Sequence, residues 1–204
     1  MQALQKMILV TAFEPFGDDA LNPTEMLLER LPERLGGCGI RTLLLPVEFV
    51  RARERAFAAY DELRPDAVVM LGQAGGRSAI TPESTGKNVM NARIPDNAGS
   101  MPEHLPIVEN GPETLRATLP IGKIVEAVSG LGIPCEQSDD AGEYVCNCLL
   151  YGMLDHNKGA VPTGFIHVPF IPEQGHPDKP FMCLSDMEWG ICAALGAVAS
   201  EISR

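Results

Sequence analysis

The chain of 204 residues has the length of one domain, and 45% of its residues are hydrophobic, which is enough for a sizeable core. Its formal net charge of -11 disfavours nucleic acids and anionic membrane surfaces as partners, because both attract clusters of Lys and Arg. No run approaches the roughly 18 consecutive apolar residues of a membrane span, so no membrane partner is expected. We therefore predict a cytoplasmic protein with a single domain, residues 1–204, in which all six cysteines are free thiols.

Short apolar runs alternate with helical patterns along the chain. Runs rich in Val, Ile, Leu and Phe predict strands buried on both faces at 7–13, 41–47, 66–74 and 163–170. Apolar residues at helical spacing predict helices at 23–35, 48–63, 119–133, 146–159 and 186–202. Asn22 is expected to cap the first of these helices, with Pro23 at its first position. The segment 75–116 is predicted to be irregular. The alternation indicates an α/β fold, with an open, mainly parallel twisted sheet and helices on both faces.

Unusual residues follow the predicted strands. FEPFG comes after the first strand, GQAGGR after the third, and HVPFIPEQ closes the last. The carboxyl ends of parallel strands meet at one edge of a sheet, and ligands bind there. These three segments therefore predict a functional site at that edge.

The stretch AGEYVCNCLLYG contains two candidate nucleophiles. Cys146 would lie near the start of a helix, where the helix dipole lowers the pKa of a thiol. Cys148 would face about 200° further round the helix, so the two sulfurs cannot share one role. The pattern alone favours the alternative that both are core residues, because free cysteine is among the most buried residue types.

A cysteine nucleophile also needs a histidine base. His167 ends an apolar strand and can reach the predicted site, although a structural role fits the pattern better. His156 follows a helical stretch and is expected to interact with the helix dipole, and the loop residues His104 and His176 are expected to be solvated. Cys146, Cys148, His156 and His167 lack a standard metal-ligand spacing, so no metal is expected.

For the group that would orient the histidine, Glu83 stands out in ITPESTGKN among polar, uncharged neighbours. Carboxylates in loops are usually solvated, so composition alone does not select it. GQAGGR lacks the order of glycines found in phosphate-binding loops.

Longer motifs resolve these alternatives, because together they resemble the pyroglutamyl peptidase type I family of cysteine peptidases. The motifs are VTAFEPFGDDALNPTE (10–25), LGQAGGRSAITPESTGKNVMNARIPDNAG (71–99), AGEYVCNCLLYG (141–152) and GFIHVPFIPEQ (164–174). They occur in the family's order and spacing, and the resemblance covers essentially the whole chain. It implies a cysteine exopeptidase that hydrolyses the amide bond after an N-terminal pyroglutamyl residue, acts on such peptides without metal or organic cofactor, and forms a homo-oligomer (dimer or tetramer).

The resemblance also implies the site residues. Cys146, His167 and Glu83 correspond to the catalytic triad, which leaves Cys148 as a core residue. The backbone N–H of Cys146 and the Arg93 side chain correspond to the oxyanion hole. The pocket for the lactam ring corresponds to Phe13, Phe16, Asn22, Val47, Gln73, Ile94, Tyr144 and Val145.

The chain departs from the family pattern near this pocket. Val47 stands where the family commonly has Thr. Bulky apolar residues are usual after Glu83, where this chain has Ser84, Thr85 and Gly86, and Met90 and Asn91 replace an acidic pair. These changes concern substrate preference more than the type of reaction. Two rival interpretations stay open: a cysteine amidohydrolase for another small lactam or acyl amide, and a non-catalytic binding protein on the same fold.

Overall fold

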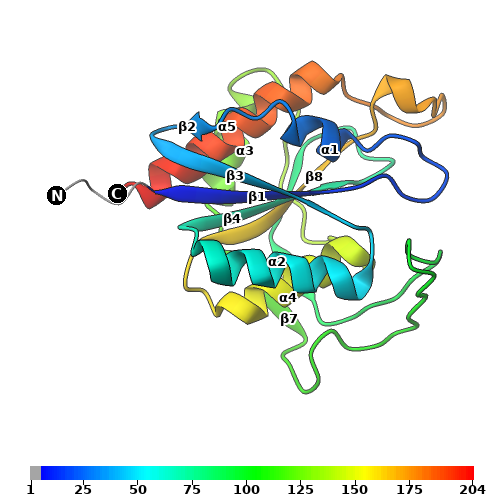
Figure 1. Ribbon diagram of the computed structural model, residues 1–204. Helices are drawn as coiled ribbons and strands as arrows, with labels where there is room; N and C mark the ends of the chain where they lie inside the picture. Colours follow the sequence, from blue (N-terminus) through cyan, green and yellow to red (C-terminus); the bar gives the residue numbers. More distant parts are fainter. Residues whose placement is uncertain (1–5) are drawn as a thin grey trace.

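A computed structural model describes residues 6–204 of the chain (Figure 1). Its strands and helices, in chain order, are β1 (Met7–Phe13), α1 (Pro23–Leu28), β2 (Arg34–Leu35), β3 (Cys38–Leu45), α2 (Phe49–Leu63), β4 (Ala67–Gln73), β5 (Thr81–Glu83), β6 (Thr85–Lys87), β7 (Thr114–Arg116), α3 (Ile121–Ser129), α4 (Val145–Asn157), β8 (Thr163–Val168), a 3-10 turn (Pro172–Gln174) and α5 (Leu184–Ile202).

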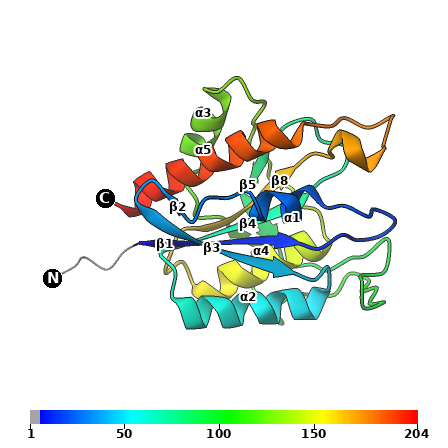
Figure 2. The same ribbon diagram turned by 45° about the horizontal axis from the view of Figure 1, so that its top comes forward.

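Six strands form one sheet in the order β2-β3-β1-β4-β8-β5. The four inner strands β3, β1, β4 and β8 run parallel, and β2 and β5 are antiparallel edges. Helices α2 and α4 cover one face of the sheet, and α1, α3 and α5 cover the other (Figures 1 and 2). This arrangement confirms the predicted α/β/α fold with a mainly parallel sheet.

The sheet separates two buried apolar clusters. Ile8 and Val10 of β1 pack with α3 and α5 on one face, whereas Met70 and Phe165 pack with α2 and α4 on the other. Side chains of successive strand residues point to opposite faces, so strands that contribute to both clusters must be apolar on both sides. This requirement explains why the inner strands read as continuous apolar runs.

The predicted helix 23–35 is only half present. Asn22 caps α1, its side chain accepting a hydrogen bond from the backbone N–H of Thr24, but the helix ends at Leu28. Pro32 lies further along the predicted segment, and a proline inside a helix removes a hydrogen bond and clashes with the preceding turn. The chain instead forms the short edge strand β2, which turns into β3 through Gly36 and Gly37 at positive φ.

The segment 75–116 is less irregular than predicted, because it contains β5 and the β6–β7 hairpin. These strands have three residues each, too few to show an alternating pattern. The hairpin packs on α4, where a Cβ at Gly86 would lie 3.1 Å from the backbone of Tyr151. Helix α4 is therefore enclosed by the sheet, α2 and this hairpin. Within residues 6–204, no helix combines the length and the apolar character required to span a membrane.

Candidate active site

The carboxyl ends of β4 and β8 create the space for the site. Gly72 of β4 is the register partner of His167 of β8. A Cβ at position 72 would lie 2.6 Å from the Phe165 ring and 3.0 Å from the Cys146 sulfur. Glycine at this position therefore lets the Cys146 sulfur approach the sheet beside the strand that carries His167.

Cys146 is the second residue of α4, as the sequence predicted for a residue near a helix start. The first N–H groups of a helix have no acceptor within the helix, so the Cys146 backbone N–H can donate to an anion. Burial raises the pKa of the Cys146 thiol to about 12, and the negative charge of Glu83 adds to this shift. The predicted lowering of this pKa is therefore wrong in direction, because burial outweighs the nearby charge of Arg77 and the backbone hydrogen bond of Cys146, both of which lower it.

His167 and Glu83 form a buried pair. The His167 Nδ1 lies 2.7 Å from the Glu83 Oε1, across the antiparallel strands β8 and β5. Burial lowers the pKa of His167, although Glu83 acts in the opposite direction. Burial alone would raise the pKa of Glu83, but the hydrogen bond to His167 and the charges of His167 and Arg77 hold it below its ordinary value. The arrangement is therefore an ionised carboxylate that orients a neutral imidazole, with the Nε2 atom left for chemistry.

Arg77 is a further charged residue at this site, and sequence reasoning overlooked it. Its Nη1 lies 2.5 Å from the Glu83 Oε1 and also donates to the Thr81 hydroxyl. Its Nη2 donates to the Asp140 carbonyl at 2.7 Å. The available signal was the basic residue that ends GQAGGR, directly after a buried strand.

A small pocket with a cavity volume of about 20 Å³ lies beside Cys146. Its wall brings together residues from β1, the loops after β1 and β3, the end of β4 and the start of α4. They are Phe13, Phe16, Asn22, Val47, Gln73, Tyr144, Val145 and Cys146. With the exception of Ile94, every residue that the sequence assigned to the lactam pocket lines this one.

Hydrogen bonds hold the loops around the small pocket. The Asn22 amide donates to the Glu14 carbonyl at 3.0 Å, so this cap also fixes the FEPFG loop. The Gln73 side chain donates to Asp19 at 3.2 Å and accepts from Gln174 at 2.7 Å. Asn22 thus orders the FEPFG loop, and the Gln73 side chain is occupied by structural contacts.

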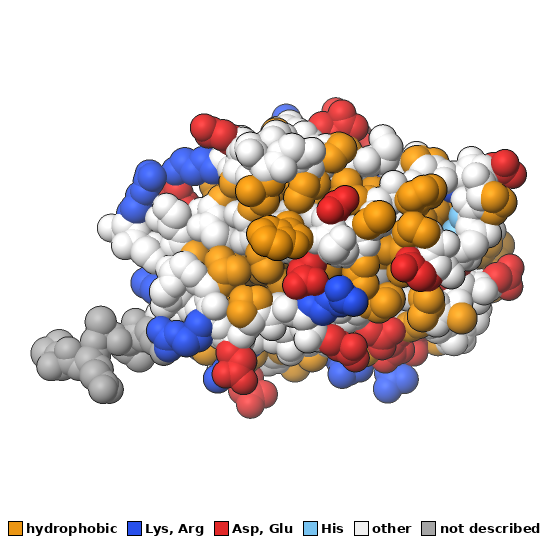
Figure 3. All heavy atoms as spheres, turned by 90° about the horizontal axis from the view of Figure 1, so that it is seen from above, with side chains coloured by type: hydrophobic (Ala, Val, Ile, Leu, Met, Phe, Trp, Pro, Cys, Tyr) orange, Lys and Arg blue, Asp and Glu red, His pale blue; other side chains and the backbone are white. Residues whose placement is uncertain are grey.

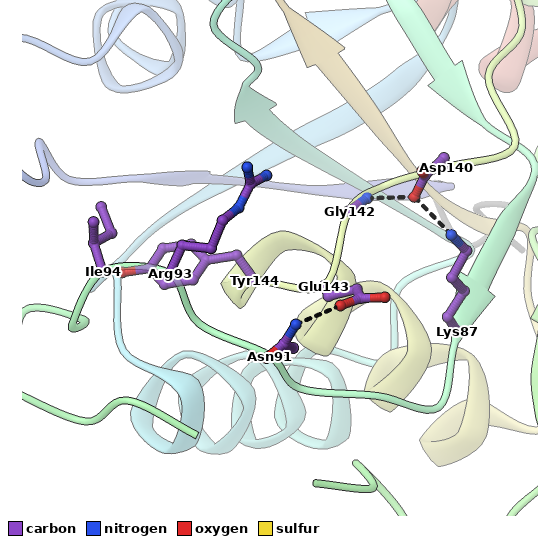
Figure 4. A pocket seen from close by; sticks show the side chains of 8 residues that line it. All are labelled: Lys87, Asn91, Arg93, Ile94, Asp140, Gly142, Glu143 and Tyr144. Carbon is purple, nitrogen blue, oxygen red and sulfur yellow. Dashed lines mark hydrogen bonds and ion pairs between the residues drawn. The ribbon is translucent and has the colours of Figure 1, made fainter. Parts of the chain in front are cut away.

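A larger neighbouring pocket, with a cavity volume of about 510 Å³, shares Tyr144 with the small one (Figure 4). Its wall consists of Lys87, Asn91, Arg93, Ile94, Asp140, Gly142, Glu143 and Tyr144. Ile94 is 48% exposed and belongs to this pocket, so its predicted place in the lactam pocket differs from the structure. The loop 91–95 carries it away from the buried wall. Arg93 lines the same pocket, and across its wall the Asn91 amide donates to the Glu143 carboxylate at 2.9 Å (Figure 4).

The remaining candidates lie apart from the triad. Cys148 is fully buried, with its sulfur 3.7 Å from the Phe49 carbonyl, which confirms that it is a core residue. His156 is in the last turn of α4 as predicted and pairs with Asp61.

His176 differs from its prediction. It is not freely solvated, because its Nε2 lies 2.7 Å from the Asp19 carboxylate and its ring packs on Phe170. Within the described part of the chain, no three His, Cys, Asp or Glu side chains lie together in a way that would hold a metal ion.

A cysteine at a helix start, at the same edge of the sheet as a histidine that a buried carboxylate orients, is typical of a cysteine hydrolase. Comparison with known proteins identifies the group within this class. The chain belongs to the pyroglutamyl peptidase family, whose family model matches residues 6–201. This result confirms the resemblance seen in the motifs.

Individual relatives and solved structures agree with this assignment. Pyrrolidone-carboxylate peptidase 1 of Caldanaerobacter subterraneus subsp. tengcongensis is 42% identical over 96% of this chain and 99% of its own length. The pyrrolidone-carboxylate peptidase of Staphylococcus carnosus is 41% identical over 95% of this chain and 93% of its own. The crystal structure of pyroglutamyl peptidase I from Bacillus amyloliquefaciens superposes with a TM-score of 0.93 at 36% identity, covering 96% of both chains. These comparisons give no support to the two rival interpretations.

Proposed function

We propose that the protein is a cysteine exopeptidase that hydrolyses the amide bond after an N-terminal pyroglutamyl residue, so that peptides with this terminus are its substrates. One observation carries the proposal: Cys146 lines the small, mainly apolar pocket. Membership of the pyroglutamyl peptidase family supports the same reaction.

Cys146, His167 and Glu83 would act as the triad. The Cys146 sulfur attacks the pyroglutamyl carbonyl while the His167 Nε2 accepts the thiol proton, and Glu83 stabilises the imidazolium that forms. The proton then passes to the leaving amine, which gives a pyroglutamyl thioester. Water, deprotonated by His167, hydrolyses this thioester and restores the thiol.

The direction of the pKa shifts defines the resting state of this mechanism. The thiol pKa of Cys146 is raised to about 12 and the pKa of His167 is lowered, so both groups are neutral in the free protein at neutral pH. Proton transfer to His167 therefore accompanies the attack on the substrate rather than preceding it. General base catalysis of this kind typically contributes about 10²–10⁴-fold to the rate.

The negative oxygen of the tetrahedral intermediate needs hydrogen-bond donors. The backbone N–H of Cys146 lies in the first turn of α4, where it has no intrahelical acceptor. The Arg93 side chain lies in the neighbouring pocket and makes no hydrogen bond or ion pair with another residue between 6 and 204. We assign these two groups to the oxyanion hole, where preorganised donors have their largest effect.

The small pocket would receive the lactam ring. Phe13, Val47 and Val145 are buried and apolar, which suits a neutral ring without an ammonium group. Phe16, whose ring lies 6.2 Å from that of Tyr144, would close the opposite side. The main chain at Gln73 would pair with the lactam. The larger pocket, with Arg93 and Ile94, would receive the peptide beyond the scissile bond.

The substrate test compares fluorogenic pyroglutamyl, prolyl and glutaminyl amides at neutral pH. A prolyl ring carries a charged amine and lacks the ring carbonyl, so the small pocket would bury an unpaired ammonium and leave its polar partners unsatisfied. We expect kcat/KM for the pyroglutamyl amide to exceed that for the prolyl amide by about 10³-fold or more. Equal cleavage of the two would contradict the proposal and favour a less selective cysteine hydrolase.

We also propose that the protein acts in the cytoplasm as a metal-free homo-oligomer. All six cysteines are free in the structure, which suits a reducing compartment. Apolar side chains gather on the outer face of the α1, α3 and α5 layer, where Trp189 is 67% exposed (Figure 3). A second copy of the chain would cover such a face.

Two measurements test these proposals. Light scattering gives the mass in solution, and a wild-type monomer at micromolar concentration would contradict the oligomer. Loss of activity in EDTA would contradict the metal-free reaction.

A further inference from the structure

Two glycines allow the turn after β4 to place Arg77 next to Glu83. A Cβ at Gly75 would lie 2.3 Å from the Phe170 ring, and Gly76 has a φ of +94°, a conformation that other residues rarely adopt. The turn after β4 can therefore follow this path only with glycines at both positions. It places the Arg77 side chain beside β5, with 27% of that side chain exposed and its partner Glu83 fully buried.

The Arg77 guanidinium connects two parts of the site. One nitrogen contacts Glu83 and Thr81 of β5, and the other donates to the Asp140 carbonyl. A guanidinium is planar and presents its donors in a fixed fork, so holding both sides fixes their relative position. A lysine ammonium carries the same charge but is a single point, and it cannot reproduce both sets of contacts.

Asp140 belongs to the turn 138–142, which leads into the helix of the nucleophile. Its carboxylate accepts a hydrogen bond from the backbone N–H of Gly142 at 2.9 Å and pairs with Lys87 at 2.9 Å (Figure 4). Cys146 follows this turn four residues after Gly142. The position of the turn therefore affects where α4 begins, and with it where the nucleophile lies relative to the triad carboxylate.

We propose that Arg77 is a positioning residue of the active site, which holds Glu83 in the orientation that His167 requires and ties the turn before Cys146 to the same carboxylate. It is not a catalytic residue, because its contacts are with Glu83, Thr81 and Asp140 rather than with the reacting sulfur. The inference rests on the proposed function, since it assigns Arg77 a role in that reaction.

The charge of Arg77 predicts the direction of a pH effect. Glu83 faces His167 from β8, Arg77 from the loop after β4 and Cys146 from α4, and Lys87 lies behind Asp140. The positive charge of Arg77 lowers the pKa of Glu83, of His167 and of Cys146. Its removal raises all three, so that protonated Glu83 and His167 persist to higher pH. The acidic limb of kcat/KM then moves to higher pH.

The test compares Arg77→Gln, which removes the charge, with Arg77→Lys, which keeps it. For Arg77→Gln we expect kcat to fall by about 10–100-fold, the effect of a misplaced catalytic group, and the acidic limb to move to higher pH. For Arg77→Lys we expect a smaller fall in kcat and an unmoved limb. The control is Arg30→Gln, which breaks an exposed pair with Glu188 at 3.2 Å and should change neither quantity.

A second measurement needs no turnover: the rate at which iodoacetamide alkylates Cys146, followed against pH. The pH at which this alkylation rate increases should be higher in Arg77→Gln than in wild type. A wild-type protein without activity would contradict the proposed function but not this inference. Equal loss of activity at every pH, with both limbs unmoved, would overturn the inference and leave Arg77 a purely structural residue. If Arg77→Gln does not fold, Arg77→Lys decides, because full kcat in that variant would overturn the positioning role.

Discussion

The two faces of the sheet differ in what they bury. Between the sheet and α3 and α5, the core consists of apolar side chains such as Ile124, Val128 and Leu195. The core beneath α2 and α4 is apolar as well, but at the carboxyl edge of the strands it gives way to the buried pair of Glu83 and His167. Burying a charged group is costly unless it is paired and hydrogen-bonded, so the second face needs a network that the first does without.

This difference suggests that one layer of the fold mainly determines stability and the other mainly determines activity. Substitutions beneath α3 and α5 should change the free energy of unfolding with little effect on turnover, because no reacting group touches that layer. Substitutions at the carboxyl edge should change turnover more than stability.

The largest expected effect separates the two sulfurs of α4. Cys146→Ala should abolish hydrolysis of a pyroglutamyl amide, because it removes the nucleophile. Cys148→Ala should retain most of the activity, since Cys148 is fully buried away from the pocket. The two rates, measured on proteins with similar thermal unfolding, check this prediction. An active Cys146→Ala variant would refute the mechanism.

The next effect distinguishes the base from the group that orients it. His167→Ala should lower kcat by about 10²–10⁴-fold, the usual contribution of general base catalysis. Glu83→Gln should lower kcat less, because the carboxylate orients the imidazole and takes no proton itself. Steady-state kinetics for both variants provide the measurement. Wild-type kcat/KM in Glu83→Gln would remove Glu83 from the triad.

Leu195→Ala tests the opposite face. Leu195 is fully buried in the cluster beneath α5, and such truncations typically lower the free energy of unfolding by about 2–5 kcal/mol. We expect kcat/KM at 25 °C to stay within about twofold of wild type, since the site is on the other side of the sheet and distant sites usually act independently. Denaturant unfolding and kinetics on the same preparation measure both quantities. A large loss of kcat without a loss of stability would contradict the proposed division.

The smallest effect concerns a departure from the family pattern. Val47 lines the small pocket and is buried, and Val47→Thr would introduce the residue that the resemblance to the family predicts there. A threonine adds a hydroxyl at nearly the same volume, so we expect KM to change by about 10-fold or less while kcat stays similar. Kinetics with the pyroglutamyl amide measure this change. A change confined to kcat would show that Val47 affects the chemistry rather than binding.

Much of this structure could be predicted from the sequence. Continuous apolar runs predict the long inner strands. The segments after β1, β4 and β8 predict a site at one edge of the sheet. Seven of the eight predicted pocket residues line one pocket with Cys146, and the His167 Nδ1 lies 2.7 Å from the Glu83 Oε1 at the same edge. The roles of these residues in catalysis stay predictions.

Other features were beyond the reach of sequence patterns. Strands of three residues, such as β5, carry too little alternation to be recognised, although β5 holds Glu83. The pKa of Cys146 depends on its burial in the folded protein, which the helix start alone does not reveal. Arg77 was missed for a related reason, since its contact with Asp140 joins segments far apart in the chain and its contact with Glu83 depends on the fold of β5.

We propose Cys146 as the nucleophile of a pocket for the pyroglutamyl ring. Iodoacetamide inactivation, with the modified cysteines mapped by mass spectrometry, tests it most directly. We predict that loss of activity tracks alkylation of Cys146, and that a competitive pyroglutamyl analogue slows both to the same extent. Inactivation that tracks another cysteine, or full activity in protein alkylated at Cys146, would contradict the account.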